Sequence, residues 1–120
     1  MFMVTNKIPQ QIIIHSETSV MELIYENQIS NKFPFEFLRV YSPSAEVTGH
    51  GQETIQVGKK HIKILDVETV GNYALKINFS DGHDTGIYSW KYLVWLYQNY
   101  EKLWDQYIEK LESINGSREK

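Results

Sequence analysis

The chain of 120 residues contains no cysteine. This absence excludes disulfide bonds, thiolate catalysis, and zinc or iron–sulfur sites held by cysteine. Long hydrophobic runs are also missing, since no apolar stretch approaches the roughly 18 residues of a membrane-spanning helix. The first seven residues have neither the apolar core nor the cleavage pattern of a signal peptide. We therefore expect a soluble cytoplasmic protein without a membrane partner.

Positive charge is scarce as well. Twelve Lys and Arg face 15 Asp and Glu, which gives a net charge of −3. Nucleic-acid-binding domains usually carry a basic face, so we expect no nucleic-acid partner. Aromatic residues are plentiful at 13%, which is typical of a packed core with some stacking surface. The length and the lack of linkers or repeats predict a single domain, with its core at about residues 8–114 and a frayed tail at residues 115–120.

The first third of the chain favours a meander of short strands. The β-branched run in Ile8–His15 predicts a buried strand. Ser19–Tyr25 fits either a second strand or a short helical turn, and Ile29–Phe33 follows as a further extended segment. Glu36–Arg39 then suits one helical turn that packs its neighbours inward.

The centre of the chain predicts a β-hairpin over Tyr73–Tyr88. Before it, Ile62–Leu65 predicts a strand that continues to Val70 after a kink at Asp66. In the hairpin, Tyr73, Leu75, Ile77 and Phe79 alternate with polar or small residues, which is typical of a half-buried strand.

The sequence Asp81-Gly82 favours a two-residue type I′ turn, in which both residues have positive φ. That loop length places Leu75 opposite Tyr88, and His83 opposite Ser80 on the polar face. It places Asp84 on the apolar face.

After the hairpin, Ser89–Ile114 predicts an amphipathic helix. Ser89 is a good N-cap, and apolar residues recur after it at spacings of three and four. Asn99 can divide the segment into two helices, and Asn115-Gly116 ends it. The pattern as a whole predicts an α+β fold with a small, mostly antiparallel sheet and one or two C-terminal helices.

Three segments together resemble the gamma-butyrobetaine hydroxylase-like N-terminal domain family. They are LRVYSPSAEV at residues 38–47, VGNYAL at 70–75 and FSDGHDTGIY at 79–88. The similarity spans roughly residues 8–96. It implies a small, mostly antiparallel α+β domain, which precedes an iron and 2-oxoglutarate oxygenase domain in the hydroxylases. Similar domains stand alone in bacteria or are attached to iron–sulfur carrier ATPases.

The resemblance also implies the position of a structural zinc, held in the hydroxylases by three cysteines and one histidine. The cysteine positions fall on Ser42, Ser44 and Val47 here, and the histidine on His83. Three of the four ligands are therefore absent, and a lone histidine cannot hold a structural zinc. We expect that the zinc site does not form and that His83 is hydrogen-bonded near the turn.

A less favoured alternative is a rebuilt site of His83 with Asp84, His50 and Glu46. Its nitrogen and oxygen ligands suit zinc, iron(II) or manganese. The facial triad of an iron(II) oxygenase is missing, because Asp84 follows His83 directly, and 120 residues leave no room for the oxygenase domain. We therefore expect no enzyme activity of that kind.

Several residues are candidates for contacts with a ligand or a protein partner. Arg39 can pair with Glu46 or Asp84, or bind a ligand carboxylate, and the structural pair is favoured. Tyr41 and Asp81 lie in the motifs that carry the resemblance. Trp90, Trp95 and Trp104 point in different directions around the helix, so part of its surface is a candidate interface with a partner or a second copy.

The favoured function is a non-catalytic binding or adaptor module without a certain cofactor. The alternative is a protein that binds iron or zinc through His83 and takes part in iron or iron–sulfur handling. A weaker third hypothesis is a small enzyme with its substrate between Arg39, His50 and His83.

Overall fold

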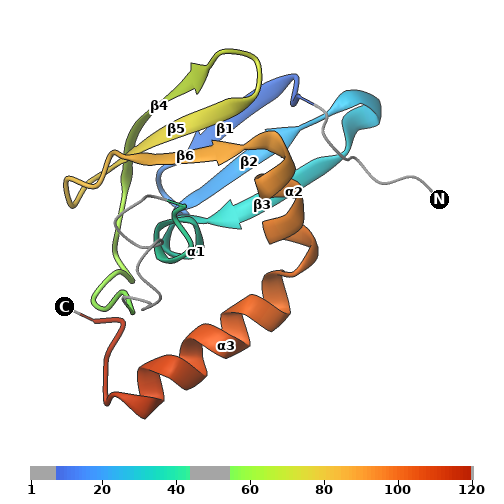
Figure 1. Ribbon diagram of the computed structural model, residues 1–120. Helices are drawn as coiled ribbons and strands as arrows, with labels where there is room; N and C mark the ends of the chain where they lie inside the picture. The colour runs from blue at the N-terminus through green and yellow to red at the C-terminus, as the bar shows by residue number, and fades with distance from the viewer. Residues whose placement is uncertain (1–7, 44–54, 120) are drawn as a thin grey trace.

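A computed structural model describes residues 8–43 and 55–119 of the chain. These residues form two three-stranded antiparallel sheets with helices beside them, which confirms the predicted α+β class (Figure 1). The first sheet has the order β1-β2-β3, and its strands are Gln11–His15, Val20–Ile24 and Ser30–Pro34. The second has the order β4-β5-β6, and its strands are Ile64–Val70, Ala74–Phe79 and Gly86–Ser89.

Two short helices belong to the first half of the chain, and two longer ones follow the second sheet. A short 3₁₀ helix, η1 (Glu26–Gln28), joins β2 to β3, and α1 (Phe35–Val40) follows β3 directly. After β6 come α2 (Trp90–Gln98) and α3 (Tyr100–Ser113). In the part of the chain described here, no helix has the length and apolarity required to cross a membrane.

The predicted meander is confirmed, and Ser19–Tyr25 forms a strand rather than a helical turn. β2 is the central strand, and its alternation buries Met21 and Leu23 completely. β4 also contains the predicted irregularity, because its register with β5 shifts between Ile64 and Asp66.

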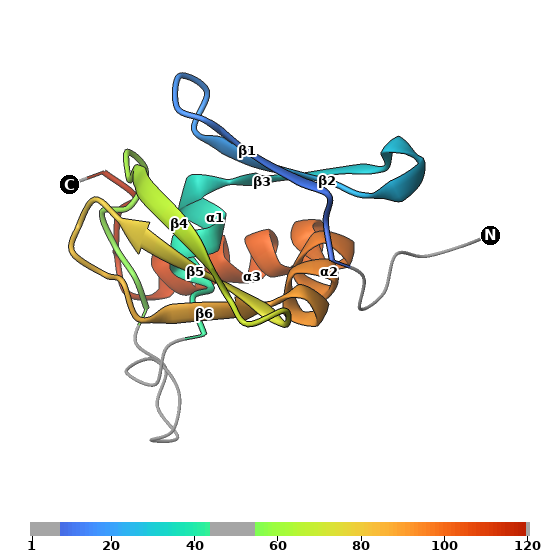
Figure 2. The same cartoon turned by 90° about the horizontal axis from the view of Figure 1, so that it is seen from above.

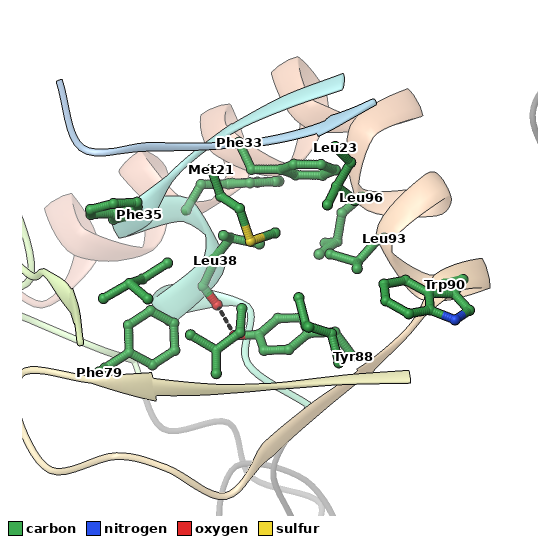
Figure 3. Packing of buried hydrophobic residues seen from close by; sticks show 14 of the residues in the cluster. Met21, Leu23, Phe33, Phe35, Leu38, Phe79, Tyr88, Trp90, Leu93 and Leu96 are labelled. Atoms are coloured by element: carbon green, nitrogen blue, oxygen red, sulfur yellow. Dashed lines mark hydrogen bonds between the residues drawn. The ribbon is translucent and has the colours of Figure 1, made fainter. Parts of the chain in front are cut away.

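The core lies between the two sheets, and α1 and α2 close its sides (Figures 2 and 3). Each large apolar side chain removed from water contributes about 1.5–3 kcal/mol, so this layer provides most of the driving force for folding. The side chains that meet here include Met21, Leu23 and Phe33 from the first sheet, Phe79 and Tyr88 from the second, Leu38 from α1, and Leu93 and Leu96 from α2.

One buried hydrogen bond fixes α1 against the second sheet. The Tyr88 hydroxyl, which is fully buried, donates to the carbonyl of Leu38, as the dashed line in Figure 3 shows. Burial raises the pKa of Tyr88, so the phenol stays neutral and keeps the proton that this bond needs.

The two C-terminal helices follow the sequence prediction closely. The Ser89 hydroxyl accepts a hydrogen bond from the backbone N–H of Tyr92 at 2.9 Å, which confirms the N-cap. Asn99 ends α2, and the chain turns into α3. α3 buries Leu103 and Leu111 against the rest of the domain.

Residues 117–119 contact the rest of the domain, within the segment for which we predict a frayed tail from the sequence. The backbone N–H of Lys60 donates to the carbonyl of Arg118. The Arg118 guanidinium donates two hydrogen bonds of 2.8 Å to the carboxylate of Glu36 and lies over the ring of Trp104. Paired and bidentate contacts of this kind order a segment that composition alone marks as mobile.

Candidate functional site

The turn between β5 and β6 is longer than the Asp81-Gly82 sequence predicts. The backbone N–H of Phe79 donates to the carbonyl of His83, and that of Gly82 donates to the carbonyl of Phe79. The loop therefore contains the three residues between Phe79 and His83, and of Asp81 and Gly82 only Gly82 has positive φ, at 88°. The type I′ prediction is wrong, because Asp-Gly also suits a three-residue loop with glycine in the left-handed conformation.

The predicted pairing of Leu75 with Tyr88 is nevertheless confirmed. One extra residue on the β6 side, between His83 and Gly86, compensates for the longer loop. The same irregularity changes the place of Asp84, which is exposed rather than on the apolar face. Asp84 lines a small hollow on the second sheet with Asp66, Glu68, Lys76 and Asn78.

Asp81 is the centre of a charged cluster at this turn. Its carboxylate accepts hydrogen bonds from Arg39 Nε at 2.9 Å, from Lys59 Nζ at 2.6 Å, and from the backbone N–H of His83 at 3.1 Å. Desolvation alone raises the pKa of Asp81, but the bonds from Lys59 and Arg39 outweigh it and lower that pKa to about 2. The carboxylate is therefore ionised at neutral pH, and this corner of the fold is held by charge.

Arg39 is buried at the end of α1, and its partner is Asp81 rather than Asp84. Glu46, the other predicted partner, lies outside the described residues. Arg39 Nη1 is buried without a hydrogen-bond partner, so Asp81 provides the main compensation for this cation among the residues described. The sequence could not identify the pair, because 42 positions separate its members.

Ser42 and His83 meet beside this cluster. Ser42 Oγ lies 2.8 Å from His83 Nε2, and Ser42 is almost completely buried. Gly86 makes the approach feasible, because a Cβ at that position would lie 2.3 Å from Ser42 Oγ. His50 and Ser44 lie outside the described residues, as does Val47.

The aromatic candidates have different environments. Trp90 is buried, and its Nε1–H donates to the carbonyl of Asn72. Trp104 is partly buried and stacks on Tyr100. Trp95 is exposed and stacks on Tyr92.

Tyr41 is also engaged within the fold. Its hydroxyl donates to the carbonyl of Leu103, and its own carbonyl accepts from the hydroxyl of Tyr92. Of the three tryptophans, Trp95 is the most exposed, at 47%, and is therefore the best placed to contact a partner.

A groove that the sequence does not predict lies between β3 and the junction of α2 and α3. Its volume is about 760 Å³. Tyr97 forms part of its wall and packs edge-on against Phe33, with ring centroids 5.9 Å apart. The break at Asn99 and the aromatic residues beside it are the only sequence signals for this surface. The residues that line the groove are Val20, Lys32, Phe33, Pro34 and residues 97–102.

The comparison with family models decides which family this chain represents. The model for the gamma-butyrobetaine hydroxylase-like N-terminal domain matches residues 12–94. The chain belongs to this family. Among proteins with curated descriptions, none matches the sequence.

Solved structures support the assignment to the hydroxylase-like N-terminal family. Two solution NMR structures share 43% and 39% identity with this chain, with TM-scores of 0.82 and 0.80. The alignments cover 94% and 98% of this chain and 90% of each relative. A crystal structure from Acidithiobacillus ferrooxidans shares 38% identity, with a TM-score of 0.63, over 73% of this chain and 90% of that chain. That protein has unknown function and belongs to the DUF971 family.

The residues at the expected zinc positions of this hydroxylase-like domain do not fit a structural zinc. Ser42 and His83 are hydrogen-bonded to each other. Of the other two expected positions, Ser44 is a poor zinc ligand and Val47 cannot bind zinc. Within residues 8–43 and 55–119, no three His, Asp or Glu side chains form a group that could hold a metal ion. The corner at His83 is a cluster of hydrogen bonds and ion pairs, which can fix geometry and charge.

Proposed function

We propose that this chain is a non-catalytic docking module that receives an extended segment of a partner protein in the groove beside β3. The observation that carries the proposal is the groove itself, which combines an aromatic wall with a strand edge that pairs with no other strand among the described residues. Clefts of about 300–1,000 Å³ with apolar walls are common binding sites in proteins. This groove, at about 760 Å³, is within that range.

The edge of β3 supports an extended partner. β3 is the last strand of its sheet, so alternate backbone groups face away from β2. The bonds from Phe35 N–H to the Ser19 carbonyl and from Tyr25 N–H to the Ile29 carbonyl fix this alternation. These two bonds show that the backbone groups of residues 29 and 35 point toward β2. Because the direction alternates along a strand, the N–H and C=O of Lys32 point away from β2, toward the open edge. A peptide strand can pair with these groups, as in other cases of β-strand addition.

Pro34 limits how far that pairing extends. It occupies the next outward position of β3, and proline has no N–H to donate. The backbone of Lys32 is therefore the main point of strand pairing, and an apolar side chain against Tyr97 provides further affinity. Lys32 and Lys102 outnumber Glu101 on the rim, which favours a segment with net negative charge.

The non-catalytic part of the proposal rests on the hairpin corner. Its charged groups are engaged with one another, because Arg39 and Lys59 both donate to Asp81. A catalytic acid or base needs access to a substrate proton at hydrogen-bond distance. The mutual pairing of these charged groups favours a structural role instead.

Selection of extended peptides from a display library on the intact chain tests the docking site. Tyr97→Ala removes the aromatic wall, and Tyr73→Ala is the matched control, because Tyr73 is exposed (59%) like Tyr97 (43%) and lies outside the groove. We expect the selected peptides to bind Tyr97→Ala about tenfold more weakly and Tyr73→Ala normally. Calorimetry of binding and a thermal melt of each variant provide the measurement and the folding control.

Two results would contradict the site. One is a set of peptides whose affinity is the same for Tyr97→Ala and the wild type. The other is dependence on Trp95 instead of Tyr97, which would place docking on the outer side of α2.

A further inference from the structure

We infer that hydrogen bonds and ion pairs hold the hairpin corner in place of the metal that the family resemblance implies, so that this chain folds without a metal. This inference concerns the corner at His83 and is independent of the groove beside β3. A structural zinc normally contributes directly to folding, and its loss must be compensated by other contacts.

The corner joins two parts of the chain that are distant in sequence. Arg39 lies in the last turn of α1 and Ser42 just after this helix, whereas Asp81 and His83 belong to the connection between β5 and β6, 42 and 41 positions away. A metal bound by both parts would close this loop. Here two side-chain contacts across the same separation close it.

The first contact leaves no space for an ion. Ser42 and His83 are the positions of the first cysteine and the histidine of the expected zinc site, and their Oγ and Nε2 atoms lie 2.8 Å apart. Two ligands of a tetrahedral zinc, each about 2 Å from the metal, lie about 3.3 Å from each other. The observed distance is that of a direct hydrogen bond. Nε2, one of the two ring nitrogens that can bind a metal, is therefore engaged by the hydroxyl.

Gly86 adapts β6 to this contact. A Cβ at Gly86 would come within 2.3 Å of Ser42 Oγ, well below the distance that real Cβ atoms tolerate. The β6 backbone therefore packs directly against the Ser42 hydroxyl, and this close contact requires a glycine at position 86. A ligand sphere needs more room than this packing provides.

The second contact adds charge to the link. Arg39 and Lys59 both donate to Oδ2 of Asp81, while Oδ1 accepts the N–H of His83. One carboxylate thus connects α1, the segment before β4 and the hairpin. Three converging donors give this carboxylate the ordering role that a bound cation has in a metal site.

Metal content and thermal stability test the inference on wild-type protein made without a metal-affinity tag. We expect no stoichiometric zinc or iron by elemental analysis. We also expect the same melting temperature with EDTA and with added zinc chloride. Stoichiometric metal whose removal lowers the melting temperature would overturn the inference.

A pair of substitutions tests the Ser42 contact itself. Gly86→Ala should lower the melting temperature by roughly 5 °C through the clash with Ser42 Oγ. The same change made in a Ser42→Ala background should cost clearly less, because the hydroxyl that it strikes is gone. Equal losses in both backgrounds would show that Ser42 and Gly86 are not packed as the structure has them, and would overturn the assigned link.

Gly82→Ala is the control for a glycine effect without a clash. Apart from the adjoining residues, no atom of the described residues lies within 4 Å of a Cβ at Gly82, so strain at its positive φ is the main cost of Gly82→Ala. That cost should not change when Ser42 is replaced. A dependence of Gly82→Ala on Ser42 would show that the loop, and not the contact at Gly86, couples to Ser42.

Discussion

Two arginine–carboxylate pairs attach the hairpin and the C-terminal tail to α1, and the burial of cation and anion is reversed between them. In the hairpin pair the Arg39 side chain is 8% exposed and that of Asp81 is 22% exposed. In the tail pair the Glu36 side chain is 8% exposed and that of Arg118 is 37% exposed. The buried member is thus a cation in one pair and an anion in the other.

The buried member of each pair belongs to α1, which explains why burial is reversed between them. This short helix contributes Glu36 to the C-terminal tail and Arg39 to the hairpin. A charge fixed inside a domain needs a partner, and a more exposed partner reaches it from the periphery in each case. α1 therefore determines where the hairpin and the tail attach, although it is only six residues long.

The largest expected effect comes from removing the partner of the buried cation. Asp81→Ala leaves Arg39 uncompensated and removes the acceptor of Lys59. We expect the free energy of unfolding to fall by about 3 kcal/mol, measured by urea denaturation. Asp105→Ala, an exposed aspartate on α3, is the control and should change stability little. A loss below about 1 kcal/mol in Asp81→Ala would show that Arg39 does not depend on this partner.

Removing the partner of the buried anion should have a smaller effect. Arg118→Ala breaks the bidentate bond to Glu36 and the contact over Trp104, and we expect a loss of about 2 kcal/mol, since water reaches this pair more easily. Adding Glu36→Gln should recover part of the loss, because a neutral amide is less costly to bury. Glu119→Ala, which breaks an exposed pair, is the control. Equal melting temperatures for Arg118→Ala and Glu119→Ala would contradict the comparison.

Acid should lower the stability less than either Asp81→Ala or Arg118→Ala does. The folded pKa of Asp81 is lowered to about 2 from 3.8. A lowered carboxyl pKa contributes stability that is present above the unfolded value and is lost as the pH falls through the folded value. Stability from Asp81 should therefore decline between about pH 4 and pH 2. Melting curves across this range should fall more steeply for the wild type than for Asp81→Ala, and parallel curves would argue against the shift.

Local pattern was enough to predict most of the elements. The alternation in Tyr73–Phe79, the hydroxyl of Ser89 and the break at Asn99 act over a few residues, and the structure contains the strand, the cap and the helix break. The turn type was missed because Asp-Gly is compatible with more than one loop length, and the observed loop is longer by one residue.

The side-chain partners could not be predicted in this way. Arg39 and Asp81 are 42 positions apart, and Glu36 and Arg118 are 82 apart. Such pairs depend on how the sheets and α1 pack, which no local pattern contains. The sequence predicts a frayed tail because it does not show that Glu36 is buried and that Arg118 pairs with it. The groove likewise forms between β3 and a helix junction more than 60 residues later in the sequence.

The helix α3 has a practical consequence for where this domain ends. The family model matches only as far as residue 94. Leu103, Tyr107 and Leu111 nevertheless close the core beyond that point, and the tail then returns to α1 through Arg118. A protein shortened at the family boundary would expose part of its interior and leave Glu36 buried without its arginine. The stretch that sequence comparison recognises is thus shorter than the unit that folds, and work with this domain should keep both helices and the tail.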